Sequence, residues 1–81
     1  MKKPLIELVL RAMREHGDVG AEFTTGQIAG FIESTAAMVN SALRSVMRSG
    51  RVNMRLASAK VAMWSLTDQG AHWVDGGALI E

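Results

Sequence analysis

Five basic side chains lie between residues 34 and 67, and no acidic side chain lies among them. They are Arg44, Arg48, Arg51, Arg55 and Lys60. The flanking segments are acidic, because residues 1–33 carry four basic and five acidic side chains and residues 68–81 carry three acidic ones without Lys or Arg. Solvated surfaces normally mix both signs. A basic segment of this length in a chain of net charge +1 therefore indicates a polyanionic partner.

The first part of this basic segment has the pattern of an amphipathic helix, from Ser34 or Thr35 to about Ser49, with Gly50 after its end. At 100° per residue, one face of the helix is apolar. That face comprises Ala36, Val39, Ala42, Leu43, Val46 and Met47. The opposite face carries small and basic residues, namely Ala37, Ser41, Arg44, Ser45 and Arg48. The apolar face is expected to pack on the core and the other face to meet the partner.

Two helices are predicted ahead of this one. The first runs from Pro4 to about His16, and residues 17–23 are expected to form a loop. Thr24 and Gln27 then match a capping box, in which each side chain bonds to the backbone N–H of the other residue. The capping box opens a short second helix. Its inward side chains are expected to be Ile28, Phe31 and Ile32.

After residue 50 the apolar pattern changes to a period of two, which is typical of strands. Residues 52–56 and 60–66 predict two half-buried strands joined as a β-hairpin. The inward positions of the first strand are Val52, Met54 and Leu56. Thr67 is expected to cap a short fourth helix that ends near Val74.

The order of helix, short helix, helix and hairpin resembles that of a winged helix-turn-helix domain over residues 5–74. An apolar residue and an alanine are followed by an apolar residue at the family's spacing: Ile28, Ala29 and Val39. The end of the third helix is also similar, with Leu43, Val46, Gly50 and Val52. The last strand leads into the next helix through Trp64, Leu66, Thr67 and Gly70. The turn departs from the family's pattern, because Glu33 stands where glycine is usual.

This resemblance implies a mainly α fold with a β-hairpin wing: three helices, the hairpin and a short C-terminal helix over residues 1–74, with residues 75–81 as a tail. It implies double-stranded DNA binding by a small bacterial or phage transcriptional regulator. The third helix would lie in the major groove, with Asn40 on adenine and Arg44 on guanine, and the wing on the backbone or minor groove. The implied DNA-binding residues are Thr35, Ala37, Asn40, Ser41, Arg44, Arg48, Arg51, Arg55 and Lys60.

Catalytic chemistry finds no support in the sequence. There is no nucleophile–base pattern and no glycine-rich phosphate loop, so a non-enzyme is expected. Cysteine is absent, and His16 and His72 lack the spacing of metal ligands. No cofactor, metal or small-molecule ligand is therefore expected. Glu7 and Arg11 interrupt the first apolar stretch, so no signal peptide or membrane span is predicted and a cytoplasmic location is expected.

Other partners stay open at this point. Winged helices also serve as adaptors, and the uncharged front of the third helix (residues 36–38) could bind protein, as in a phage-encoded inhibitor of a host protein. RNA is a further alternative, although no aromatic stacking surface is evident. A homodimer, or a dimer that forms on DNA, is expected, because surplus apolar residues gather near the two ends of the chain. They are Leu8, Leu10, Trp73, Val74, Leu79 and Ile80, with Leu8, Trp73 and Val74 as the predicted dimerisation residues. The alternative is that Trp73 and the tail fold back and complete the core of the monomer.

Overall fold

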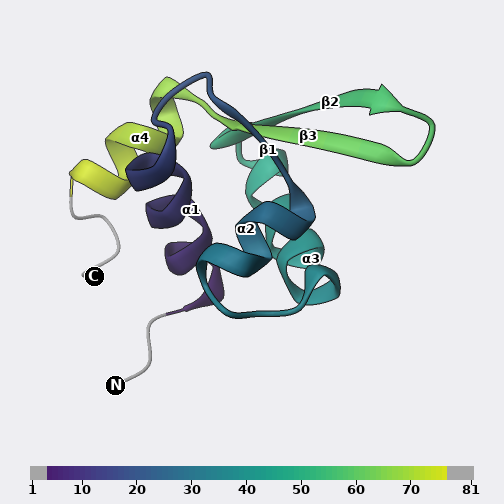
Figure 1. The fold of residues 1–81 in the computed structure, drawn as a ribbon. Coiled ribbons are helices and arrows are strands. Elements are labelled where there is room, and N and C mark those ends of the chain that lie inside the picture. The colour runs from purple at the N-terminus through teal and green to yellow at the C-terminus, as the bar shows by residue number, and fades with distance from the viewer. Residues whose placement is uncertain (1–3, 77–81) are drawn as a thin grey trace.

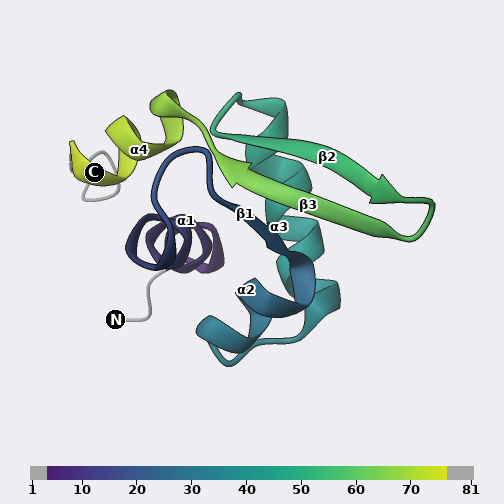
Figure 2. The ribbon, with the colours of Figure 1, turned by 45° about the horizontal axis from the view of Figure 1, so that its top comes forward.

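The computed structural model of the chain describes residues 4–76. The elements in chain order are α1 (Leu5–His16), β1 (Glu22–Thr24), α2 (Thr25–Phe31), α3 (Ala36–Arg48), β2 (Val52–Ser58), β3 (Val61–Leu66) and α4 (Asp68–Asp75). The hairpin of β2 and β3 extends to one side, away from the helices (Figures 1 and 2). The predicted mainly α architecture with a hairpin wing and a short C-terminal helix is confirmed.

Three helices begin where a threonine side chain caps them. Thr24 Oγ1 accepts from the backbone N–H of Gln27 at 3.1 Å, and Gln27 Oε1 accepts from the Thr24 N–H at 2.9 Å, so the predicted capping box is confirmed. Thr35 caps α3 and Thr67 caps α4, in each case through a threonine Oγ1 that accepts from a backbone N–H of the first turn, that of Met38 or Gly70. These bonds satisfy backbone donors that have no partner inside the helix.

The sheet has three antiparallel strands in the order β1-β3-β2. Phe23 in β1 and Met54 in β2 both pair with Trp64 in β3. The prediction of a loop over residues 17–23 was therefore wrong at its end, where β1 begins. A strand of three residues is too short to show alternation, and its pairing with β3 is non-local.

The core lies where α1, α2, α3 and α4 meet the inner face of the sheet. Its largest fully buried side chains are Trp64, Leu10, Met13, Ile28, Leu43 and Leu66. The buried indole keeps a hydrogen bond, because Trp64 Nε1 donates to Thr25 Oγ1 at 2.9 Å. Trp64 thus ties the wing's central strand to the first residue of α2.

The predicted half-burial holds for β3, where Trp64 and Leu66 are buried, but it was wrong for the outer half of β2, which is exposed. Met54 and Leu56 are 39% and 63% exposed, and Val52 is the one buried residue of β2. The hairpin reaches beyond the helices (Figure 2). Residues near its tip that point to the core side of the sheet therefore have no helix to pack on. The core prediction for Met54 was therefore wrong.

Two further residues predicted on apolar faces are exposed. Phe31 is 38% exposed. Its ring stacks on His16 with centroids 3.8 Å apart and meets Phe23 edge-on at 5.6 Å. Ala36 is exposed in the first turn of α3, where burial begins only at Val39. Both residues lie next to the turn between α2 and α3, so this end of the helix pair is outside the core.

Candidate nucleic-acid interface

The outward face of α3 carries most of the residues predicted to contact DNA. Ala37, Ser41, Arg44 and Arg48 are exposed, and Asn40 is half-buried. The opposite face holds the helix in place through its buried residues Val39, Ala42, Leu43 and Val46. Because Arg44 and Arg48 are one turn apart, their side chains leave the same side of the helix.

The two arginines of this face have no protein partner in the described part of the chain. Neither Arg44 nor Arg48 forms an ion pair or a side-chain hydrogen bond with residues 4–76. Their guanidinium groups can therefore meet a phosphate or a guanine edge. Thr35 is committed to the helix, since its Oγ1 accepts from the Met38 N–H at 3.2 Å. Its hydroxyl hydrogen can still be donated to a phosphate.

Arg55 in the wing is already paired. Its Nε and Nη2 donate to the two carboxylate oxygens of Glu22 at 2.7 and 2.8 Å. The sheet register explains the contact, because β1 and β2 flank β3 and both residues lie on the face opposite Trp64. The hydrogen bond from Arg55 lowers the pKa of Glu22, and the Glu22 carboxylate raises the pKa of Arg55. This pair removes one cation from the predicted DNA-binding charge.

Arg51 is held at the junction of α3 and α4. Its guanidinium lies over the Trp73 ring, 4.5 Å from the centroid, and its Nη1 donates to Ser49 Oγ at 2.7 Å. The side chain is half-buried, and its Nε is buried without a hydrogen-bond partner in the structure. A cation over an indole face is attracted by the ring's negative face. Arg51 therefore supports the fold at this junction.

Lys60 lies exposed at the turn of the wing and makes no ion pair with residues 4–76. The five cations of the basic segment thus form two groups. Arg44, Arg48 and Lys60 are unpaired, whereas Arg51 and Arg55 are engaged within the protein. We call the first group the open cations. Charge counting along the sequence does not separate the two groups, because Glu22 and Trp73 both lie outside the segment.

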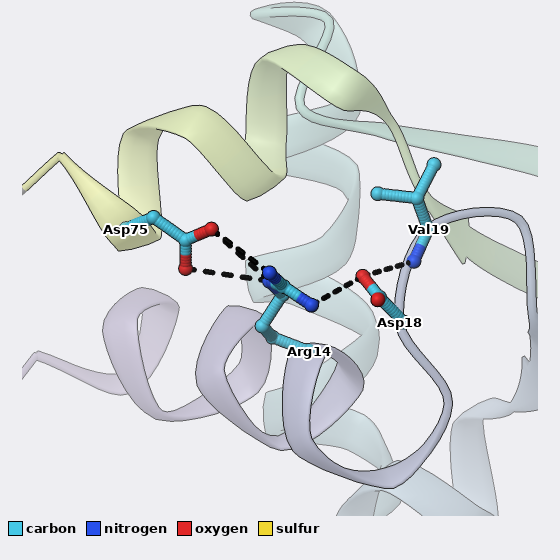
Figure 3. Close-up of polar contacts among 4 residues, drawn as sticks. All are labelled: Arg14, Asp18, Val19 and Asp75. Carbon is cyan, nitrogen blue, oxygen red and sulfur yellow. Dashed lines mark hydrogen bonds and ion pairs between the residues drawn. The ribbon is translucent and has the colours of Figure 1, made fainter.

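Helix α4 contacts α1 through exposed ion pairs centred on Arg14 (Figure 3). Arg14 Nη2 donates to Asp75 Oδ2 at 3.0 Å, and the same guanidinium pairs with Asp18. Asp18 also accepts from the Val19 N–H at 2.7 Å. Both aspartates raise the pKa of Arg14, Asp75 foremost through its hydrogen bond. Because Ala71 and Val74 of α4 are also buried in the core, α4 is an integral part of the domain.

The predicted dimerisation residues are in different environments. Leu8 is 36% exposed on α1, and Trp73 is half-buried beneath Arg51. Val74 is 6% exposed and belongs to the core, so its prediction as an interface residue is corrected: α4 packs this side chain inward. Leu10 is fully buried in the same way. Residues 79 and 80 lie outside the described residues.

Two acidic residues near the basic segment were not among the predicted site residues. Glu22 neutralises Arg55, and no local pattern indicates this because the contact depends on strand register. Glu33 lies exposed in the turn before α3 with a φ of 54°. One indication in the sequence marks this residue as unusual, because glycine is expected at this position of the turn.

The order of the elements, the α2–turn–α3 pair and the projecting hairpin define a winged helix-turn-helix fold. A candidate DNA-binding protein of Ralstonia eutropha JMP134 is similar at a TM-score of 0.80 and 20% identity, over 94% of this chain and 96% of that one. BpsR of Bordetella bronchiseptica is similar at 0.77 and 16%, over 90% of this chain and 54% of its own. ZitR of Lactococcus lactis in complex with DNA is similar at 0.70 and 21%, over 95% and 51%.

The chain therefore spans about half of the BpsR and ZitR chains. At these identities the likeness establishes the fold. No protein-family model and no curated protein matches the sequence. Within residues 4–76, no helix is long and apolar enough to cross a bilayer, and no three His, Asp or Glu side chains group as metal ligands.

Proposed function

We propose that the chain binds double-stranded DNA as a transcriptional regulator, with α3 in the major groove and the wing on the backbone or minor groove. The observation that carries the proposal is the exposed face of α3, where Arg44 and Arg48 project without an acidic partner among the described residues. A folded domain that leaves two cations unpaired on one helix face suits a polyanion. The fold shared with ZitR, which was solved with DNA, supports the same conclusion.

The predicted DNA-binding residues of α3 and the wing turn have different proposed roles. Ala37 and Ser41 are small, which lets the helix backbone approach the bases. Arg44 donates to O6 and N7 of guanine, and Asn40 contacts adenine from the edge of the same face. Arg48 contacts phosphate, which positions the protein without selecting sequence. Lys60 does the same from the wing.

A salt titration tests the proposal and counts the cations that take part. Fluorescence anisotropy with a labelled duplex would give the slope of log K against log salt concentration. Two to three phosphate contacts from the open cations predict a slope near −2 to −3 per protomer, whereas all five cations would give about −4 to −5. Binding that does not depend on salt, or no binding at low salt, would contradict the proposal.

We also propose that two copies occupy one DNA site. One small domain presents few base-reading side chains, and a genome offers many competing sites. Two copies on half-sites one helical turn apart would supply the missing discrimination and require a two-fold contact. Leu8 is the predicted contact residue that the structure leaves exposed. Light scattering on the free chain and on its DNA complex tests this, and a single copy in both samples would contradict it.

A protein partner is the second candidate, and one observation favours it. Met38 at the front of α3 is 54% exposed and borders a shallow groove between α1 and α3. The groove is lined by Leu5, Ile6, Met38, Ser41, Ala42 and Ser45, none of them charged. Apolar contacts there would resist salt, unlike phosphate contacts. Capture of a protein with equal strength in low and high salt, together with no DNA binding, would favour this function.

A further inference from the structure

In the turn between α2 and α3, one residue with a side chain has a backbone conformation that favours glycine. Glu33 has a φ of 54°, in the left-handed region. Around it, the Ile32 N–H donates to the Ile28 carbonyl at 3.3 Å and the Ser34 N–H donates to the Ala29 carbonyl at 2.9 Å. The second bond is that of a Schellman helix end, whose left-handed residue is usually glycine because a Cβ crowds the neighbouring carbonyl. The fold therefore carries a glutamate where glycine would be less strained.

No contact of the Glu33 side chain with the described residues offsets this strain. It is exposed and forms no hydrogen bond or ion pair with residues 4–76. A negative charge near a helix N-terminus is favourable, but Glu33 lies two residues before the cap Thr35, and the effect fades beyond the first turn. An unstrained acidic residue elsewhere in the first turn would serve the helix better. Backbone strain that no contact within the protein offsets points to a functional role for the residue.

The charge of Glu33 also opposes its surroundings. Between residues 23 and 67 it is the one acidic residue of the chain. Glu22, just outside this range, is neutralised by Arg55. The Glu33 carboxylate is therefore unpaired among the described residues, in the turn that leads into the helix carrying Arg44 and Arg48. Against DNA phosphates it would be repelled, so its presence lowers affinity for a general polyanion.

We propose that Glu33 determines the sequence specificity of the DNA complex, an inference that rests on the proposed function. In a helix-turn-helix complex the N-terminal residues of the recognition helix contact base edges. Glu33 lies in the turn that leads into this helix, three residues before Ala36, the first residue of α3. An ionised carboxylate only accepts hydrogen bonds, so it matches the amino group of cytosine or adenine and is repelled by the carbonyl oxygens of guanine and thymine. Glu33 thus favours DNA sites that present a base amino group at one position and weakens the binding of sites that present a carbonyl oxygen there.

The test compares three variants with the wild-type chain. E33Q keeps the shape and removes the charge, and E33G removes both side chain and strain. E15Q is the matched control, because Glu15 is exposed on α1 and its neutralisation changes the net charge equally. A random-duplex selection with wild-type protein gives the preferred site. Anisotropy then measures each protein on that site and on its single-base variants.

We expect one position of the wild-type site to favour cytosine or adenine by about tenfold or more. E33Q and E33G should shrink that preference to below about threefold and bind the disfavoured variants more tightly, whereas E15Q should change neither. E33G should also melt several degrees higher, because the left-handed position no longer carries a Cβ. A thermal melt of each protein confirms that the variants are folded.

Other outcomes would overturn the inference. If E33Q strengthens binding to every sequence alike, Glu33 only repels phosphate and selects no base. If E33Q leaves both affinity and preference unchanged, Glu33 does not meet the DNA. Each result would leave the proposed DNA binding intact. Failure of the wild-type chain to bind any duplex at low salt would instead remove the proposed function, and that is seen before any variant is measured.

Discussion

The outward face of α3 and the outer face of the sheet both belong to the basic segment, yet they differ in available charge. On α3 the helical period sends Arg44 and Arg48 away from the body, where no described acidic group reaches them. On the sheet, β1 brings Glu22 beside β3, and Arg55 is held by two hydrogen bonds. A helix sets its surface charge locally, whereas a sheet sets it by which strands pair. The charge available to a partner therefore concentrates on α3 and the wing turn.

The largest expected effect comes from removing the charge on α3. We expect R44A combined with R48A to weaken binding to the preferred duplex by about 100-fold or more at low salt, because a bidentate arginine–guanine contact is worth about 1–3 kcal/mol and a phosphate contact is lost as well. Fluorescence anisotropy on wild-type and variant protein measures this. R44A alone should also flatten the base preference.

The control for that double variant is K60A on the wing. It should weaken all sequences alike and make the salt slope shallower by about 0.9, because Lys60 is proposed to contact phosphate. If K60A altered base preference and R44A did not, α3 would not be the helix that selects the sequence.

A smaller effect is expected from the paired cation. R55A should weaken DNA affinity less than R44A or R48A does, because Glu22 already holds this guanidinium and the loss comes only from the carboxylate that is left unpaired. E22Q should free Arg55 and make the salt slope steeper by about 0.9, as one more cation meets phosphate. In the E22Q background, R55A should then reverse that gain. This double-mutant cycle is read from salt titrations of four proteins.

Equal losses from R55A in both backgrounds would show that Glu22 does not restrain Arg55, and the contrast between the two faces would fail. A third result, loss of binding in E22Q alone, would indicate that the Glu22–Arg55 pair positions the wing. Thermal melts of the four proteins separate that case from unfolding.

Most of the fold could be predicted because its signals are local. The period of α3, the Thr24–Gln27 capping box and the alternation of β3 each lie within a few residues. Strand β1 could not be predicted, because three residues carry no period and their partner strand starts almost 40 residues later. The exposure of Met54 and Leu56 also escaped prediction, because alternation shows which side a residue faces and not whether a helix covers that side.

The residues of the candidate site also differ in how far local sequence patterns predict them. Arg44 and Arg48 were predicted on the outward face of α3 from its periodicity, and they lie there. The engagement of Arg55 with Glu22 and of Arg51 with Trp73 depends on contacts between distant segments, which no spacing indicates. Val74 was misjudged for a related reason. Helix α4 packs on α1, which is distant in sequence, and Arg14 and Asp75 form an ion pair between the two helices. In this arrangement Val74 points into the core.

The smallest expected effect is the pH dependence of the Glu22–Arg55 pair. The hydrogen bond from Arg55 lowers the pKa of Glu22 below its ordinary value of 4.5. A carboxyl whose pKa is lower in the folded than in the unfolded chain stabilises the fold above the unfolded pKa, and loses that contribution as pH falls through the folded value. The melting temperatures of wild type and R55A should therefore differ slightly at neutral pH and converge in acid below the folded pKa of Glu22. An NMR titration gives the direct measurement: the Glu22 carboxyl should titrate below pH 4.5 in wild type and at a higher pH in R55A. The same midpoint in both proteins would show that the pair does not persist in solution, and Arg55 would then join the open cations.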